Sequence, residues 1–208
     1  LVIDLDLHRV RAPGGGVALD HAADQAAEQI HGQARRQVRG RVMQLVLVDI
    51  DRKRAHGEAL DLMHGQGYAG RIMVQDGDYD LLAGCQVVVI AAGAAQKPGE
   101  TRLDLLNKNA AIFRGIAAEL DRHAPDAVIV VASNPVDILT YIMQELSTRP
   151  PEKVIGTGTM LDTSRFRSLL GDYYHVDPKS VHGYILGEHG DTEFAAWSTV
   201  TIGGKSPV

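Results

Sequence analysis

The sequence predicts an α/β fold with a doubly wound parallel sheet, and two observations support this prediction. Short apolar runs alternate with amphipathic helical segments from residue 44 to residue 174. The apolar runs show no polar alternation, which is expected when helices cover both faces of a parallel sheet. Because ligands bind at the carboxyl ends of the strands in such sheets, the residues that follow each strand are the first candidates for function.

The first half of the predicted sheet begins at residue 45. The run LVLVDI at 45–50 is apolar except for its aspartate, and it predicts a buried strand. A helix is expected over 52–64, where Ala55 and Ala59 recur four residues apart on one face. The next strand is expected at 86–91, where four aliphatic residues follow one another.

The second half of the pattern contains the longest helix, expected over 103–123. Phe113 and Leu120 belong to its apolar stripe, which indicates a face buried against the sheet. The remaining expected elements are strands at 127–132 and 153–156 and helices at 136–147 and 162–174. This alternation predicts that neighbouring parallel strands are connected through helices.

Composition excludes several functional classes. The chain has 208 residues, 45% of them hydrophobic, a formal net charge of −5 and a pI of about 6.0, so nothing suggests nucleic-acid binding. The basic cluster at 35–41 is a local exception that a solvated face explains. Cys85 is the single cysteine, which excludes an intramolecular disulfide, suits a reducing cytosol and, beside an apolar run, predicts an inert buried thiol. No apolar stretch approaches the roughly 20 residues that span a bilayer.

Residues 1–43 lack the clear pattern of the rest of the chain. A helix over 18–38 would have a poor apolar stripe, made mostly of alanine. A dinucleotide-binding fold places a glycine-rich turn about 20 residues before the acid that ends its second strand. Here the corresponding window at 24–29 contains no glycine, and the glycines at 14–16 lie too far upstream. We therefore expect residues 1–43 to be an atypical segment in place of the usual first strand and glycine-rich loop.

Three predicted strand ends carry residues suited to ligand binding: Asp49, AGA at 92–94 and SNP at 133–135. An acid at such a position accepts hydrogen bonds from the adenosine ribose of a dinucleotide, which favours NAD over its phosphorylated form. The same position also suits a helix N-cap, and the residue alone does not decide between the two interpretations.

The most distinctive segment is GEHGDTE at 187–193, which follows the apolar run at 184–186. A histidine delivered by a strand end into a glycine-lined bend is placed for proton transfer near neutral pH. We therefore predict that His189 lies at the centre of a catalytic site. His182 is expected to be a surface residue, and no spacing of histidine, cysteine or carboxylate residues predicts a metal site.

Two charged segments are candidates to act with this histidine. Asp162 and Arg165 lie three residues apart in a predicted helix and share a face. The acid can hold a histidine in one tautomer and the arginine can bind a carboxylate through two parallel hydrogen bonds; the alternative is an internal ion pair. The loop at 96–102 contains a Pro-Gly pair and Arg102, and it is either a surface loop or a segment that closes over a substrate.

Taken together, five motifs resemble the L-lactate/L-malate dehydrogenase family, and most closely its bacterial L-lactate dehydrogenases. They occur in the family's order and cover about residues 44–208. The matching segments are LVLVDID at 45–51, AAGAAQKPGETRLDLLNKN at 91–109, ASNPVDILTY at 132–141, GTGTMLDTSRFR at 156–167 and HGYILGEHGDTEF at 182–194.

The resemblance implies a role for each candidate residue. His189 would donate and accept the proton, Asp162 would be its partner, and Arg102 would polarise the keto oxygen of the substrate. The implied substrate-binding residues are Gln96, Arg102, Asn134, Asp162 and Arg165. The implied NAD-binding residues are Asp49, Arg54, Tyr79, Gly93, Ala94, Ala132, Ser133, Asn134 and Thr157.

The resemblance also implies a reaction, the reversible reduction of pyruvate to (S)-lactate by hydride transfer from NADH, with a histidine as proton donor. A malate-type enzyme needs a cation at position 96 for the second carboxylate of its substrate, because an unpaired buried carboxylate is costly. The neutral Gln96 favours pyruvate, and the adjacent Lys97 keeps malate dehydrogenase as the alternative.

Regulation and assembly are further expectations from the resemblance. Arg167 and His182 match the positions at which bacterial members bind the activator fructose bisphosphate, and two cations from different elements suit such a phosphate. The resemblance also implies an allosteric, cytoplasmic homotetramer in glycolysis and pyruvate fermentation, with no nucleic-acid or membrane partner.

The resemblance divides the chain after the atypical segment into an NAD-binding domain at 44–157 and the start of an α+β catalytic domain at 158–208. The expected architecture is therefore a Rossmann-type sheet with an incomplete substrate domain. The family continues well beyond residue 208, so we expect a partial gene product. We also expect residues 1–43 to come from a misread reading frame or from a junction with a foreign sequence. An inactive fragment that acts at most as an assembly module is the alternative.

Overall fold

The computed structural model describes residues 44–69, 72–95, 99 and 101–207. The expectations for residues 1–43, Gln96 and Lys97 lie outside these ranges. The chain divides into two units. The first unit ends at Gly156, and the second runs from Thr157 and also takes in Pro135–Asp137.

Two parallel sheets form the centre of the first unit. One pairs β1 (Gln44–Leu47) with β2 (Met73–Asp76), and the other contains β3 (Val87–Ile90), β4 (Val128–Val131) and β5 (Val154–Gly156) in that order. A doubly wound sheet has the strand order 3-2-1-4-5-6. The two sheets fill positions 3-2 and 4-5-6 of that order, which confirms the Rossmann-type prediction. Position 1 is the usual first strand of this order, in place of which the sequence analysis expects an atypical segment at residues 1–43.

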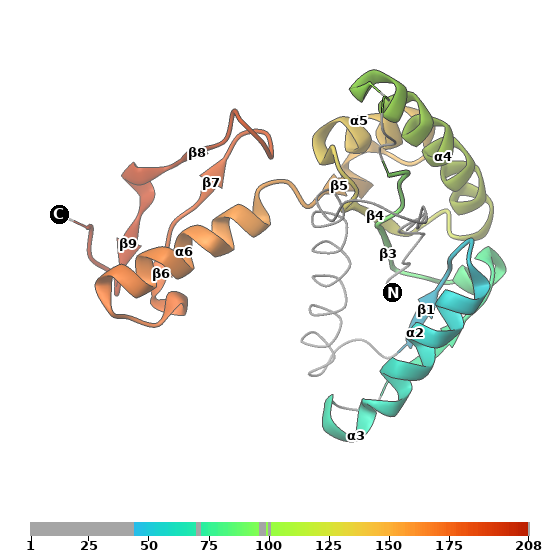
Figure 1. The fold of residues 1–208 in the computed structure, drawn as a ribbon, viewed down its shortest axis with the longest axis horizontal. Coiled ribbons are helices and arrows are strands. Elements are labelled where there is room, and N and C mark those ends of the chain that lie inside the picture. The colour runs from blue at the N-terminus through green and yellow to red at the C-terminus, as the bar shows by residue number, and fades with distance from the viewer. Residues whose placement is uncertain (1–43, 70–71, 96–98, 100, 208) are drawn as a thin grey trace. The chain divides into compact units, whose positions relative to one another are not determined.

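Three helices of the first unit confirm the predicted ranges to within one residue, namely α2 (Arg52–His64), α4 (Arg102–His123) and α5 (Val136–Leu146). A fourth, the short α3 (Gln66–Ala69), was not predicted. α2 packs along β1 and β2 (Figure 1), with Ala55 and Ala59 buried. In α4 the predicted stripe is buried, and Phe113 and Leu120 have no exposed surface. None of the described helices is long and apolar enough to cross a membrane.

Two strand expectations need correction. The strand predicted at 45–50 pairs only to Leu47, although Val48 and Asp49 beyond it remain buried. β2 was not predicted at all. Among the described residues, β2 pairs with β1 alone, and only its Val74 is buried. A strand with so little buried surface does not need an apolar run, and its sequence MVQD has none. Cys85 is a half-buried free thiol, and burial raises its pKa above the ordinary value.

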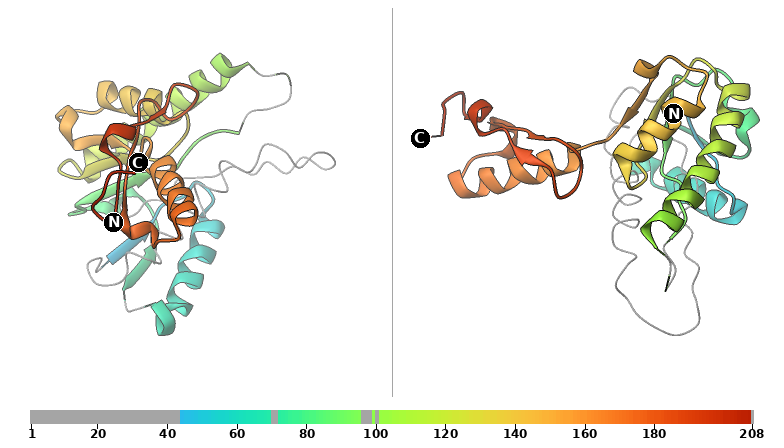
Figure 2. Two further views of the ribbon diagram at one scale, coloured as in Figure 1. Left: turned by 90° about the vertical axis from the view of Figure 1, so that its left-hand side faces the viewer. Right: turned by 90° about the horizontal axis from the view of Figure 1, so that it is seen from above.

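The second unit is small. α6 (Met160–Tyr174) lies beside two antiparallel pairs of two-residue strands (Figure 2). These pairs are β6 (Val181–His182) with β9 (Thr201–Ile202), and β7 (Ile185–Leu186) with β8 (Phe194–Ala195). Its core is formed by Leu170, Val181 and Val200, with Phe166 packed against them. The turn between β7 and β8 carries the GEHGDTE segment.

Candidate active site

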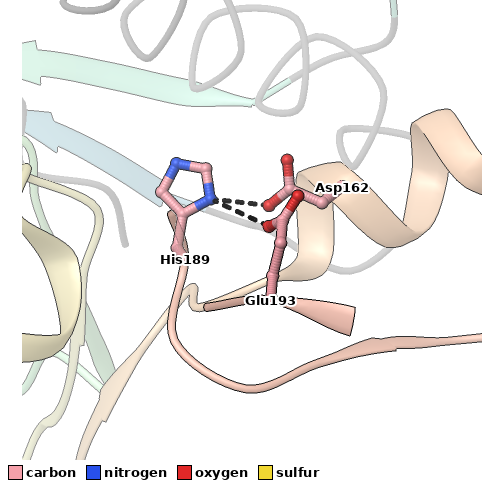
Figure 3. A group of neighbouring side chains, drawn as sticks. All are labelled: Asp162, His189 and Glu193. Carbon is pink, nitrogen blue, oxygen red and sulfur yellow. Dashed lines mark hydrogen bonds and ion pairs between the residues drawn. The ribbon is translucent and has the colours of Figure 1, made fainter. Parts of the chain in front are cut away.

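The centre of the site is a pair formed by His189 and Asp162. His189 lies in the turn between β7 and β8, and Asp162 lies in the first turn of α6. Nδ1 of His189 is 2.6 Å from Oδ2 of Asp162, and the aspartate is only 8% exposed (Figure 3). Because an ionised carboxylate only accepts hydrogen bonds, this contact places a proton on Nδ1. Nε2 is then the nitrogen that can exchange a proton with a substrate.

Two threonines, one at the N-cap and one in the first turn of α6, hold the strand that precedes His189. The hydroxyl of Thr159 donates to the carbonyl oxygen of Ile185 at 2.7 Å, and the hydroxyl of Thr163 accepts from the Ile185 N–H at 3.0 Å. Both threonines lie one turn of helix or less from Asp162. The same helix therefore fixes both partners of the pair, the aspartate directly and the histidine through β7.

The turn itself depends on glycine at one position. Gly187 has φ +99°, and a Cβ there would lie 3.0 Å from the carbonyl oxygen of Thr192. Most side chains disfavour this left-handed conformation, so the sequence analysis was right to expect a glycine-lined bend. Within the same unit, the backbone N–H of His189 donates to Oδ2 of Asp137 at 3.0 Å.

Arg165 shows features of both interpretations offered by the sequence. Its Nη1 lies 3.4 Å from Oδ1 of Asp162, so the internal ion pair is present. The arginine side chain is 52% exposed, and one contact of this kind leaves most of its five N–H donors facing solvent. A carboxylate-binding role for Arg165 stays a prediction that this geometry permits.

Glu193 was missed by the sequence analysis. Its Oε2 lies 4.0 Å from Nδ1 of His189, on the side where Asp162 also lies (Figure 3). The signal was present in the sequence, since Glu193 follows His189 by four residues in a tight hairpin. Glu193 was not connected with Asp162 because the resemblance paired Asp162 with His189 and implied no role for Glu193.

The loop before α4 is described only in part. Gln96 and the side chain of Arg102 lie outside the described residues, so their predicted roles remain predictions. Thr101 caps α4 in a reciprocal arrangement with Asp104, whose backbone N–H donates to the Thr101 hydroxyl. Hydrogen bonds from the Thr101 hydroxyl and backbone N–H hold the pKa of Asp104 below its ordinary value. The cap fixes the point where the loop ends.

Asp49 does not cap α2. The N-cap is Asp51, whose Oδ1 accepts from the backbone N–H groups of Lys53 and Arg54. Asp49 lies two residues earlier at the end of β1, is 6% exposed, and accepts from the Asp51 N–H at 2.7 Å. An oriented, buried carboxylate at this strand end fits an adenosine ribose, so the residues present fit the dinucleotide.

The ends of β3 and β4 are tied together by buried polar groups. The hydroxyl of Ser133 donates to the carbonyl oxygen of Ala92 at 2.5 Å. On α4, Asn109 is 2% exposed, and its Oδ1 accepts from the Ala94 N–H at 2.8 Å. Asn109 was missed, although a polar residue within the apolar stripe of a helix is a detectable signal. These bonds fix the Gly93–Ala94 backbone, which the sequence analysis assigned to the cofactor site.

The remaining cofactor candidates occupy several elements. Tyr79 begins the short helix η1 (Tyr79–Leu82), and burial, together with the charges of Glu119 and Asp78, raises its pKa to about 12. Tyr79 is therefore a neutral phenol at physiological pH. The other candidates, all half-buried except the exposed Asn134, are Arg54, Ala132, Asn134 and Thr157.

The two residues expected to bind an activator lie near β6. His182 is exposed, as predicted for a surface residue. Nε of Arg167 donates to the carbonyl oxygen of Gly183 at 2.9 Å, and its guanidinium lies 4.8 Å from the ring centre of Tyr184. Arg167 is thus held in place by a hydrogen bond and a cation–π contact.

The fold and the histidine–aspartate pair define a class of protein. A parallel sheet covered by helices, with a buried acid at the end of a strand, is a dinucleotide-binding arrangement. A following α/β unit that presents a histidine on a buried aspartate supplies acid–base chemistry. The class is that of the NAD-dependent oxidoreductases with two α/β domains.

Comparison with known proteins identifies the family. Residues 14–156 match the lactate/malate dehydrogenase NAD binding domain, and residues 159–207 match the lactate/malate dehydrogenase alpha/beta C-terminal domain. The chain belongs to the lactate/malate dehydrogenase family, and the cofactor of its first domain is NAD. The first match begins at residue 14, upstream of residue 44, where the motif-based resemblance begins.

Curated relatives include L-lactate dehydrogenases from Salinibacter ruber, 58% identical over 163 residues, and from Thermus aquaticus, 47% identical over 167 residues. These alignments cover 78% and 80% of this chain but 52% and 54% of the relatives, so the chain spans about half their length. Similar solved structures belong to the same family. A lactate dehydrogenase from a Medee basin deep-sea metagenome library has a TM-score of 0.79 at 38% identity, covering 99% of this chain and 60% of that one. The ligand-bound minor L-lactate dehydrogenase from Enterococcus mundtii has a TM-score of 0.78 at 42% identity and the same coverages.

Proposed function

We propose that this chain carries the residues of an L-lactate dehydrogenase and reduces pyruvate reversibly to (S)-lactate. The observation that carries the proposal is the 2.6 Å contact between Nδ1 of His189 and Oδ2 of the buried Asp162. The names of the curated relatives support the same substrate pair. NAD supplies the hydride chemistry when it is bound; the protein supplies the proton, the orientation and the charge.

His189 is the proton donor in the proposed mechanism. In the direction of pyruvate reduction, the protonated imidazole donates from Nε2 to the keto oxygen while Nδ1–H stays hydrogen-bonded to Asp162. The aspartate charge stabilises the imidazolium and fixes the ring orientation. In the reverse direction, the neutral ring accepts the proton of the lactate hydroxyl at Nε2.

The other proposed roles follow from charge and hydrogen bonding. Arg165 binds the substrate carboxylate with its solvent-facing donors, and Arg102 polarises the keto oxygen when the loop closes. Asn134 orients the substrate, and Asp49 accepts hydrogen bonds from the adenosine ribose. A cytoplasmic, fermentative role for the whole protein belongs to the same proposal.

The decisive experiment is NADH oxidation by the purified chain with pyruvate and with oxaloacetate in parallel. We expect turnover with pyruvate and a much lower kcat/KM with oxaloacetate. Faster turnover of oxaloacetate would favour the malate dehydrogenase alternative. NADH binding without turnover of either acid would contradict the enzyme proposal and leave a fragment that acts at most as an assembly module.

Gln96→Arg is expected to shift this preference toward oxaloacetate. A cation at this position pairs with the second carboxylate, and a hydrogen bond to a charged group is worth about 1.5–3 kcal/mol, or roughly 10- to 150-fold in kcat/KM. Lys97→Gln serves as the matched control, because it changes the charge of the adjacent residue and leaves position 96 unaltered. An equal shift in both variants would show that position 96 does not select the substrate.

We further propose that Arg167 and His182 bind fructose bisphosphate in a homotetramer. Pyruvate saturation curves with and without the sugar bisphosphate test this proposal, and sedimentation gives the oligomeric state. The sugar is expected to lower the KM for pyruvate, and His182→Gln is expected to reduce that effect because it removes one phosphate contact. An unchanged saturation curve for the unmodified chain would exclude the activation.

A further inference from the structure

A third side chain lies beside the His189–Asp162 pair and has no part in the proposed mechanism. Nδ1 of His189 faces the carboxylates of both Asp162 and Glu193 (Figure 3). One ligand atom from each of the three residues lies within 4.8 Å of the other two. Over the ranges that the structure describes, this is the one group of three histidine, cysteine or carboxylate residues that close together.

We infer that Asp162, His189 and Glu193 form a binding site for a zinc ion. An imidazole nitrogen with carboxylate oxygens is a ligand set that zinc accepts. Zinc bonds of about 2.0–2.2 Å in a tetrahedron place ligand atoms roughly 3.4 Å apart. The Nδ1–oxygen distances of 2.6 Å to Asp162 and 4.0 Å to Glu193 lie on either side of that value. Zinc binding therefore requires rotations of the partly exposed His189 and Glu193 side chains that lengthen the first distance and shorten the second.

Charge also favours a divalent cation at this position. With a neutral imidazole, two carboxylates converge on one ring nitrogen, whose single proton bridges to Asp162 alone at 2.6 Å. For Glu193, the described residues offer no partner nearer than this nitrogen. Nη1 of Arg165 lies 3.4 Å from Oδ1 of Asp162, but the arginine side chain is 52% exposed. It therefore offsets only part of the negative charge of the two carboxylates. Zinc neutralises both carboxylates, whereas magnesium prefers six oxygen ligands and is a poor fit.

Occupation of the site has a clear chemical consequence. Zinc on Nδ1 takes the place of the proton that joins His189 to Asp162. The ring then loses the hydrogen bond that orients it, and a divalent charge on the imidazole opposes its conversion to the imidazolium. Zinc should therefore inhibit pyruvate reduction. This inhibition rests on the proposed function, whereas the binding of zinc does not.

Titration of the untagged chain with zinc, monitored by calorimetry, tests the binding. Glu193→Gln is expected to weaken zinc affinity by more than about tenfold, since even changes outside the ligand sphere cost roughly 10- to 100-fold. Glu188→Gln is the matched control, because Glu188 is an exposed carboxylate of the same hairpin outside the group. It should bind zinc as the unmodified chain does. Nitrogen-15 spectra should show zinc, but not magnesium, displacing the Nδ1 proton of His189.

Two outcomes would overturn the inference. Equal zinc affinities for Glu193→Gln and Glu188→Gln would show that Glu193 is not a ligand, and an unperturbed His189 ring in the presence of zinc would show that the ion binds elsewhere. A chain that binds zinc as described but never reduces pyruvate would retain the zinc site while contradicting the proposed function. A chain that turns over pyruvate but does not bind zinc would support the proposed function and contradict the zinc site.

Discussion

Asp162→Asn should lower kcat for pyruvate reduction by about 10²- to 10⁴-fold, the range that general acid–base catalysis contributes. The substitution keeps the size of the side chain but removes the charge that stabilises the His189 imidazolium. It also replaces one carboxylate oxygen with an N–H donor, so Nδ1 can become an acceptor and carry no proton. Because Asp162 is 8% exposed, water cannot restore the lost interaction.

Two measurements separate this effect from general damage to the unit. Asp172→Asn makes the same chemical change at an exposed position of the same helix, α6, and should leave kcat unaltered. Nitrogen-15 spectra of the imidazole should show a smaller population with the proton on Nδ1 in Asp162→Asn. If turnover survives this substitution, proton donation by a histidine held on Asp162 is not part of the mechanism.

Local signals in the sequence located most helices because each signal has a local physical cause. Helix ranges were predicted to within two residues from the spacing of apolar residues on one face, and the structure shows that polar caps such as Thr101 and Asp51 satisfy the first backbone N–H groups of α4 and α2. Buried strands were evident where aliphatic residues follow one another. β2 has no such run, and it forms a strand through its parallel pairing with β1, a non-local interaction that hydrophobic periodicity does not record.

In the candidate site, too, some residues were predicted from the sequence and others were not. The histidine of the GEHGDTE segment and its aspartate partner were predicted, and the structure brings them to 2.6 Å. Thr159, Thr163 and Glu193 were missed because the resemblance that paired Asp162 with His189 implied no role for them, and their contacts depend on the approach of α6 to the hairpin. For Asp49 the structure removes one of the two interpretations, since the N-cap of α2 is Asp51, and nucleotide binding stays a prediction.

Arg149 has a buried structural role that the sequence did not indicate. It stands between a threonine and two prolines, where an exposed arginine is the ordinary expectation. Its side chain is instead 1% exposed and forms an ion pair with Asp121 of α4. The guanidinium also donates to the carbonyl oxygens of Leu120, Ala124 and Ala127. A cation thus satisfies the last carbonyls of α4 and complements its dipole.

Arg149→Met should destabilise the first unit by about 3–5 kcal/mol, the cost of breaking a buried ion pair by removing one partner. The methionine fills much of the volume, but Asp121 loses its cation and three carbonyl oxygens lose their donors. Urea unfolding monitored at α4 measures the change as a lower midpoint at constant slope.

Arg122→Met is the matched control for this prediction, because Arg122 pairs with Glu119 at 3.4 Å on the same helix but is 67% exposed. Exposed ion pairs contribute about 0–1 kcal/mol, so its midpoint should move little. Hydrogen exchange adds a local readout: the amides at the end of α4 should lose protection in Arg149→Met and keep it in Arg122→Met. Equal midpoints for the two variants would mean that the buried arginine contributes no more than a surface charge. Packing and the hydrogen bonds that Asp121 accepts from Ser147 and Thr148 would then be sufficient to join the end of α4 to the segment after α5.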